Sequence, residues 1–306
     1  MDEPWQLIFN PVAGAGAGRA ARARAAVIGH LRALGIEFED HDTEGPGHAA
    51  MLSREAWRAG RKRFLIAGGD GTVSEVINGI FDGGVPDTQP VVAAIPLGSG
   101  NDWVRSRGAE VGVARIVEKL AAPSYRECPV GVVRGVDGDQ EWQRYFANSA
   151  GIGLDVCVLR QLPRWRVAAA RYAVGLVRAF GTFEAREACL IADGEARRGV
   201  SLLNLCALGA YTGGGMCLAP HASAAPRELA VTWVADVSWR RLALSGRKIY
   251  NGTLGERPEV ALYHAKKVEF VAPVGEPLQI DGEIIGVTPA VVEIFPAAVL
   301  TLAGQL

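Results

Sequence analysis

Three glycines surround one aspartate in the segment LIAGGDGTVSEVINGI, residues 65–80, between an apolar run and an amphipathic one. Glycine lets another object approach the backbone closely but costs conformational entropy, so such a cluster needs a reason. Bare backbone N–H groups at a helix start, with the helix dipole behind them, form an anion site. Residues Gly68–Gly71 around Asp70 therefore predict a phosphate-binding loop. The alternative is a plain strand-to-helix turn, which the capping-box spacing of Thr72 and Glu75 already favours.

A second glycine turn of the same design occurs in IPLGSGNDWVR, residues 95–105, where Ser99 and Asp102 also have capping-box spacing. Both loops directly follow strand-like runs. The carboxyl ends of parallel strands meet at one edge of a sheet, which is where ligands of open α/β folds bind. The two segments therefore predict a single ligand site at that edge.

The elements that must position these loops alternate between strand and helix over residues 1–128, as a parallel α/β sheet requires. The expected strands are 5–10, 36–43, 63–69 and 90–98, and the expected helices are 19–35, 47–59 and 73–81. Beyond residue 128, short apolar runs are broken by glycine, aspartate and proline, which is typical of an antiparallel sandwich, with a helical insertion near 160–182. The predicted fold is α/β: a parallel-sheet domain, 1–128, followed by an antiparallel β-sandwich domain, 129–306, whose last strand can return to the first domain.

The composition is that of a globular protein, with 49% hydrophobic and 21% charged residues. The net charge of −1 gives no reason to expect nucleic acid as a partner. Five cysteines without a CxxC pair predict neither a disulfide framework nor a zinc site. The acidic start MDEPWQLIF is unlike a secretory signal, and no run of about 18 apolar residues predicts a membrane span, so we expect a cytoplasmic protein.

Five segments together carry a family resemblance: FNPVAG, GGDGTVSEVINGI, PLGSGNDWVR, GGGMCLAPHA and IDGE. Their order over nearly the whole chain resembles the diacylglycerol kinase catalytic family, the bacterial lipid kinases related to sphingosine and ceramide kinases. GGDGT alone is shared with NAD kinases, whereas its combination with EVING and GSGND is specific to lipid kinases. The resemblance implies that ATP binds in a cleft between the α/β domain and the β-sandwich.

The resemblance also implies roles for individual residues. Asp70 and Asp102 would anchor Mg²⁺ directly or through water, since ATP phosphates form a hard-oxygen site. Glu283, in the IDGE motif, would accept the proton of the acceptor, with Asp281 beside it and Asp70 completing the catalytic set. From the residues alone, IDGE is an ordinary hairpin turn. The residues expected to contact ATP are Asn10, Thr43, Gly68, Gly69, Asp70, Gly71, Thr72, Gly98, Ser99 and Asn101.

One segment departs from the family pattern. Where the family carries two aspartates and a glycine that bind a structural Mg²⁺, this chain has Ala225, Pro226 and Arg227. Alanine and proline offer no side-chain oxygen, so we expect that ion to be absent or displaced. The loss keeps open a second class of function, a nucleotide-binding or membrane-surface protein without kinase activity. NAD kinase is a third alternative.

A lipid kinase must meet its acceptor at a bilayer, and residues 156–183 contain five arginines, no acidic residue and many apolar side chains. This composition favours an interfacial helix on an anionic membrane, here the inner membrane surface, although a solvated basic helix packed on the sandwich has the same pattern. The segment 238–254 repeats the pattern. We expect a lipid acceptor with a free hydroxyl, and the resemblance suggests a homodimer. The basic residues are Arg160, Arg164, Arg166, Arg171 and Arg178, then Arg240, Arg241, Arg247 and Lys248.

Overall fold

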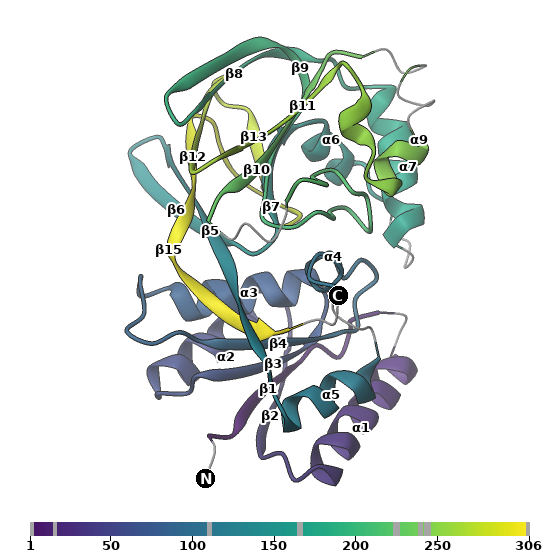
Figure 1. Ribbon diagram of the computed structural model, residues 1–306, viewed down its shortest axis with the longest axis vertical. Helices are drawn as coiled ribbons and strands as arrows, with labels where there is room; N and C mark the ends of the chain where they lie inside the picture. The colour runs from purple at the N-terminus through teal and green to yellow at the C-terminus, as the bar shows by residue number, and fades with distance from the viewer. Residues whose placement is uncertain are drawn as a thin grey trace. The chain divides into compact units, whose positions relative to one another are not determined.

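The computed structural model describes residues 3–14, 17–108, 112–163, 168–222, 227–237, 241 and 246–303. The chain forms two compact units (Figure 1). Unit 1 comprises Met1–Pro129 and Pro296–Leu306, and unit 2 comprises Val130–Phe295. Two strands of 13 residues each, β5 (Tyr125–Asp137) and β15 (Ala290–Leu302), supply residues to both units.

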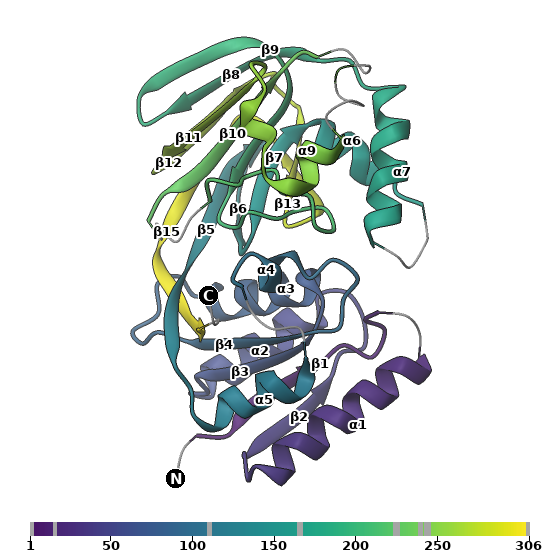
Figure 2. The same ribbon diagram turned by 45° about the vertical axis from the view of Figure 1, so that its right-hand side comes forward.

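Unit 1 is built on a parallel sheet in the order β15-β4-β3-β1-β2 (Figures 1 and 2). Its central strands are almost uninterrupted apolar runs because both faces of the sheet are covered, and all five residues of β1 are buried. The parallel α/β fold expected from the sequence is confirmed. In chain order its elements are β1 (Trp5–Phe9), α1 (Ala17–Ala33), β2 (Phe38–Asp42), α2 (His48–Arg58), β3 (Arg63–Gly68), α3 (Asp70–Phe81), β4 (Val91–Pro96), α4 (Asp102–Arg105) and α5 (Val113–Ala121).

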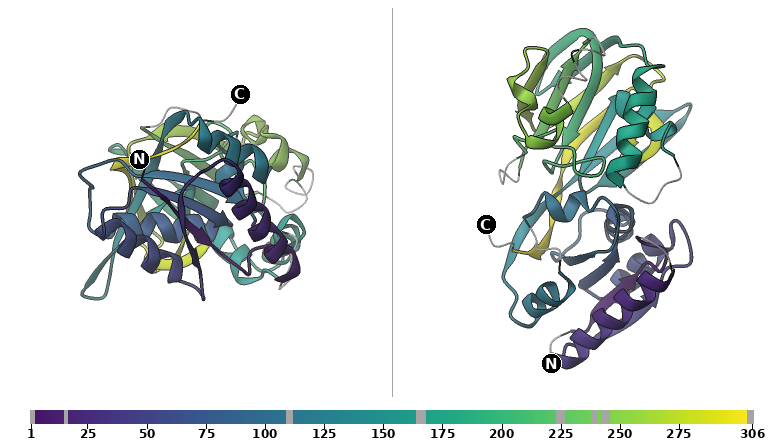
Figure 3. Two further views of the ribbon diagram at one scale, coloured as in Figure 1. Left: turned by 90° about the horizontal axis from the view of Figure 1, so that it is seen from below. Right: turned by 90° about the vertical axis from the view of Figure 1, so that its right-hand side faces the viewer.

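Helices lie on both faces of this sheet. Helices α1 and α5 cover one face, where Leu31 and Val117 join Leu65 of β3 in one core cluster (Figure 2). Helices α2 and α3 pack against each other on the opposite face (Figure 3, left). Their contact is close because position 79 is a glycine: a Cβ on Gly79 would lie 2.1 Å from the Oγ of Ser53. The C-terminal half of α3 is thereby held closely against α2.

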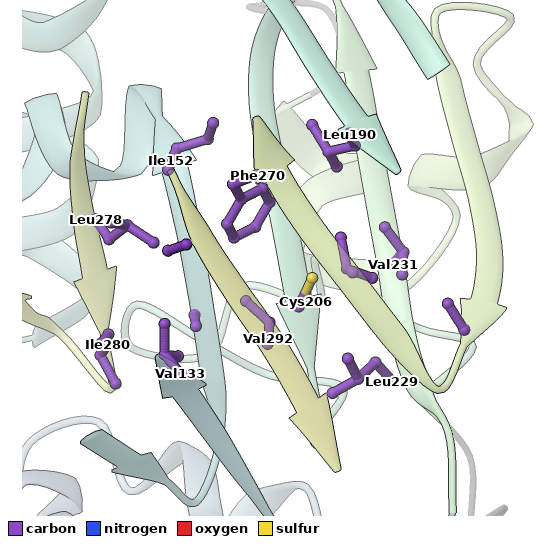
Figure 4. Packing of buried hydrophobic residues seen from close by; sticks show 14 of the residues in the cluster. Val133, Ile152, Leu190, Cys206, Leu229, Val231, Phe270, Leu278, Ile280 and Val292 are labelled. Atoms are coloured by element: carbon purple, nitrogen blue, oxygen red, sulfur yellow. The ribbon is translucent and has the colours of Figure 1, made fainter. Parts of the chain in front are cut away.

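Unit 2 is a strongly curved antiparallel sheet that encloses an apolar interior. Its backbone order is β14-β13-β7-β9-β8-β12-β15, with β10 and β11 added at β9 and β5 and β6 added at β15. Figure 4 shows Leu190, Phe270, Val231 and Val292 pointing toward one another in this interior. Its remaining strands are β6 (Gln140–Phe146), β7 (Ser149–Gly153), β8 (Arg186–Ala192), β9 (Glu195–Ala207), β10 (Leu229–Ala235), β11 (Val260–Ala265), β12 (Lys267–Ala272), β13 (Pro277–Ile280) and β14 (Glu283–Val287).

Helices cover the outer face of strands β7, β9 and β10. They are α6 (Leu154–Arg160), α7 (Ala168–Phe180), α9 (Gly246–Asn251) and the short 3₁₀ helix η1 (Leu254–Glu256), with α7 drawn in teal in Figure 3, right. Successive residues of a strand face opposite sides, so Leu205 of β9 packs under the helices while Cys206 packs in the interior. Among the described residues, no helix is long and apolar enough to cross a membrane.

Candidate active site

Three loops of unit 1 converge where strands β1, β3 and β4 end. Asn10 follows β1 directly, and its Nδ2 donates a hydrogen bond to the Oγ1 of Thr72 at 3.0 Å, in the first turn of α3. The Oδ1 of Asn10 accepts from the N–H of Val12 at 3.1 Å. One side chain therefore shapes its own loop and ties it to the next.

The two glycine loops touch backbone to backbone. A Cβ on Gly98 would lie 2.6 Å from the Cα of Gly69, so a side chain at either position would force the loops apart. The carbonyl of Gly68 accepts from the N–H of Leu97 at 2.8 Å and also from the N–H of Gly98 at 3.2 Å. The glycines are thus required by the approach of the two loops, and they leave a backbone surface at the start of the 12-residue helix α3.

The expected capping boxes are wrong, and the physical reason lies in tertiary contacts. Helix α3 begins at Asp70, with Gly69 as its N-cap and no capping side chain. The carboxylate of Glu75 instead accepts from the N–H of Ala49 at 3.1 Å, at the start of α2. In the same way, α4 has Asn101 as its N-cap, and the Oδ1 of Asp70 accepts from the N–H of Trp103 at 2.9 Å. Both acidic residues thus serve the start of a neighbouring helix.

The remaining residues of the predicted nucleotide site also lie at this edge. Asn101 adopts a left-handed conformation with φ of 53°, and its Nδ2 donates to the carbonyl of Gly98 at 2.8 Å. Its Oδ1 is buried and has no hydrogen-bond partner within the described part of the chain. Thr43 follows β2 and is buried, with its N–H donating to the carbonyl of Phe9 at 2.8 Å. Ser99, in contrast, is exposed.

This arrangement is suited to an anion. The start of α3 presents N–H groups and the positive end of the helix dipole beside the glycine loops. Among the described residues, no cluster of three His, Cys, Asp or Glu side chains that could hold a metal ion occurs. Asp70 keeps its Oδ2 available beyond the hydrogen bond to Trp103, and Asp102 begins α4 nearby. Two carboxylates next to an anion site fit an Mg²⁺ ion that takes its other ligands from phosphates and water.

In unit 2 the IDGE motif forms a two-residue hairpin turn between β13 and β14. Asp281 and Gly282 have φ angles of 48° and 85°, as a type I′ turn requires. The carboxylate of Asp281 accepts hydrogen bonds of 2.7–3.0 Å from three successive N–H groups, those of residues 147–149. Asp281 thus pins the turn to the β6–β7 connection. Glu283 follows the turn, and its Oε2 lies 3.0 Å from the Nη2 of Arg144.

An apolar cavity of about 90 Å³ lies beneath α6 and α7, against the outer face of the sheet. By this measure a water molecule needs about 10–15 Å³, so the cavity has room for roughly six to nine groups of that size. Polar side chains are few in its lining, which also includes Gly282, the residue directly before Glu283. The lining comprises Leu154, Asp155, Val158, Leu159, Tyr172, Leu176, Leu202, Leu203, Leu205, Thr212, Gly213, Met216, Leu218, Val234, Ile249, Leu254, Gln279 and Gly282.

Asp155 is the carboxyl group of this cavity and was not predicted from the sequence. Burial raises its pKa to about 7, against the opposing effect of hydrogen bonds from the backbone of Val156 and the side chain of Gln279. Its Oδ2 is buried and has no hydrogen-bond partner among the described residues. At the first turn of a helix an aspartate is commonplace, so the sequence offers no signal that this one faces an apolar space.

Several expectations concern residues outside the described segments, namely Arg164, Arg166, Ala225, Pro226 and Arg240. The loss of a structural Mg²⁺ therefore stays a prediction. Among the described basic residues, Arg241 pairs with Glu259 at 2.9 Å and Lys248 pairs with Glu256 at 2.5 Å. These ion pairs favour the packed, structural interpretation of the second basic segment.

Comparison with known protein families finds a match for each of the two units. Residues 4–133 match the diacylglycerol kinase catalytic domain, and residues 148–303 match the YegS C-terminal NAD kinase beta sandwich-like domain. The chain belongs to this diacylglycerol kinase family. The resemblance seen in the sequence motifs is confirmed.

Individual relatives of the family agree over nearly the full chain. The Bacillus subtilis protein YtlR, whose name describes it as a lipid kinase, is 26% identical over 93% of this chain and 94% of its own length. A diacylglycerol kinase of Staphylococcus carnosus is 24% identical over 93% and 90% of the two chains. The crystal structure of a diacylglycerol kinase from Bacillus anthracis superposes with a TM-score of 0.73 at 19% identity, covering 99% of this chain and 97% of that one. That structure supports the fold.

Proposed function

We propose that this member of the diacylglycerol kinase family transfers the γ-phosphate of ATP to the hydroxyl group of a lipid such as diacylglycerol. The apolar cavity of unit 2 carries the lipid part of the proposal, because its lining includes Gly282 in the turn that precedes Glu283. A lipid acceptor has the matching shape, an apolar body with one hydroxyl group at its end. Family membership supports the kinase part.

The loops of unit 1 would hold the nucleotide. The backbone N–H groups around Gly69 and Gly98 and the start of α3 are suited to the phosphates. Asp70 and Asp102 would hold Mg²⁺ directly or through water, and the ion supplies neutralisation of the phosphate charge. The side chains of Asn10 and Thr72 hold two of these loops together.

In the proposed reaction, the hydroxyl oxygen of the lipid attacks the γ-phosphorus of ATP. The bond between that phosphorus and the oxygen bridging to the β-phosphate breaks, ADP leaves, and the hydroxyl proton passes to the carboxylate of Glu283. Such transfers depend mainly on positioning and charge neutralisation. We assign Asp281 to positioning, since three backbone N–H groups already occupy its carboxylate.

We also propose that unit 2 meets its acceptor at an anionic membrane surface. On α7, the side chain of Val177 is 74% exposed next to the exposed Arg178, a combination suited to the lipid interface. Sedimentation with anionic vesicles tests this, with Val177→Glu as the variant. Binding unchanged by that substitution contradicts a role for α7.

The central test is ATP-dependent phosphorylation of a panel of hydroxylated lipids in mixed micelles with Mg²⁺, with NAD as an additional acceptor. We expect one lipid to gain phosphate, and we expect Asp70→Asn and Glu283→Gln to lose that activity. The matched control is Glu141→Gln, which replaces an exposed glutamate on β6 and should retain kinase activity. Leu176→Trp, which narrows the cavity, should raise KM for a long-chain acceptor but not KM for ATP.

Two results contradict the proposal. Phosphorylation of NAD instead of any lipid identifies an NAD kinase. Protection by ATP against heating, without transfer to any acceptor, identifies a nucleotide-binding protein without kinase activity.

A further inference from the structure

The side chain of the proposed proton acceptor, Glu283 on β14, contacts a residue of β6, a strand that does not pair with β14. Strand β14 forms backbone hydrogen bonds with β13, and β6 forms them with β5, so β6 and β14 are joined through side chains. The Nη2 of Arg144 on β6 lies 3.0 Å from the Oε2 of Glu283 on β14. Two residues earlier on the same face of β6, Trp142 packs against Gly286 of β14, where a Cβ would lie 2.1 Å from the indole Cζ2.

Stability does not explain the ion pair between Arg144 and Glu283. The side chain of Glu283 is 48% exposed and that of Arg144 is 24% exposed, and ion pairs at such sites contribute little to the free energy of unfolding. The Nε of Arg144 is buried and has no hydrogen-bond partner among the described residues, which is unfavourable. Arg144 therefore contacts one carboxylate oxygen of Glu283 while its buried Nε stays without a hydrogen bond among the described residues.

The surroundings of Glu283 show what that orientation achieves. Glu283 follows the turn formed by Asp281 and Gly282, and Gly282 lines the apolar cavity. A glutamate side chain has three rotatable bonds, so the turn fixes its backbone but not its carboxylate. In the described part of the chain, Arg144 is the side chain recorded in contact with that carboxylate.

We propose that Arg144 is a positioning residue that fixes the carboxylate of Glu283 for transfer of the acceptor's proton. This inference rests on the proposed function, because it assumes that Glu283 accepts that proton. The carboxylate of Glu283 has a second oxygen, Oε1, which remains for the hydroxyl proton while Oε2 stays on the guanidinium. The planar guanidinium suits this task better than a lysine ammonium, which does not fix direction.

The test compares Arg144→Gln and Arg144→Lys with a matched control on the neighbouring strand. Arg134 of β5 pairs with Glu293 at 2.6 Å, so Arg134→Gln removes an equivalent surface ion pair elsewhere in the sandwich. We expect Arg144→Gln to lower kcat by roughly tenfold to a hundredfold, the effect of a misplaced reacting group, with KM for ATP and the melting temperature unchanged. Arg144→Lys should recover part of kcat, and Arg134→Gln should match the unsubstituted protein.

A double-substitution cycle separates this inference from the function on which it rests. If Arg144 acts through Glu283, Arg144→Gln has no further effect on kcat once Glu283→Gln is present. The role of Arg144 is overturned if the losses in kcat caused by Arg144→Gln and Glu283→Gln multiply in the double variant. It is also overturned if Arg144→Gln keeps full activity, or if Arg134→Gln loses as much activity as Arg144→Gln. Full activity of Glu283→Gln itself instead overturns the assignment of the proton acceptor. A lowered melting temperature of both Arg144 variants with unchanged kcat assigns Arg144 to stability alone.

Discussion

Asp155 should make the stability of this protein depend on pH in an unusual direction. Burial raises the pKa of Asp155 to about 7 from 3.8, so the folded protein keeps a proton that the unfolded chain has already released. The contribution of Asp155 to the free energy of unfolding is therefore fully present below about pH 4. It falls as pH rises toward 7, at about 1.4 kcal/mol per pH unit. Over about three pH units the loss reaches ~4 kcal/mol, an upper value because Asp155 retains some accessible surface.

The perturbation that tests this is Asp155→Asn, which keeps the shape of the side chain but cannot ionise. The quantity to measure is the free energy of unfolding of the variant minus that of the unsubstituted protein, from urea titrations between about pH 4.5 and about pH 8.5. Other titrating groups cancel in this difference. Over this pH range we expect the difference to rise with pH by up to ~3 kcal/mol and to level off above about pH 7. A difference that is constant with pH would refute the reasoning.

Two further substitutions test the packing that positions the site. Gly79→Ala places a methyl group 2.1 Å from the Oγ of Ser53, so we expect overpacking to cost about 1–3 kcal/mol in urea unfolding, and stability equal to the original would show that α2 and α3 separate freely. Asp281→Asn removes the charge that accepts three N–H groups, so we expect a loss of about 1.5–3 kcal/mol in stability. Lost activity at unchanged stability would instead give Asp281 a direct part in the reaction.

The strands and first three helices of unit 1 were predictable because their signal is local, whereas helices α4 and α5 were not predicted. A central parallel strand is buried on both faces, so WQLIF and RFLIAG appear as apolar runs, and the helices between them follow the 3.6-residue period. The glycine loops were recognisable for the same reason, since each occupies a few consecutive residues. Their meeting at one sheet edge followed from the topology of a parallel sheet.

Helix capping was not predictable, because the correct partners are distant in sequence. Thr72 with Glu75 and Ser99 with Asp102 have the right local spacing, yet Glu75 serves a helix 26 residues earlier and Asp70 serves one 33 residues later. A motif based on spacing cannot weigh these tertiary alternatives. Both residue pairs therefore have the spacing of a capping box without forming its side-chain hydrogen bonds.

The chemical details of unit 2 were hidden for a related reason. Arg144 and Glu283 are 139 residues apart, and nothing in either segment indicates the other. Asp155 has an ordinary position in the first turn of α6, and its unusual environment arises only when α7 and strand β9 close the cavity around it. Such environments depend on folding and not on local pattern.

Strand β15 has a consequence for synthesis on the ribosome. In unit 1 it pairs with β4 through Leu300 and Val91, so the sheet of this unit takes up a strand made about 200 residues after its neighbour. At about 5–20 residues per second, this interval lasts roughly 10–40 s. During that time β4 presents an unpaired, largely apolar edge to other nascent chains, which is a known route to aggregation. Unit 1 is translated first, but its sheet is therefore completed only after unit 2 has been synthesised.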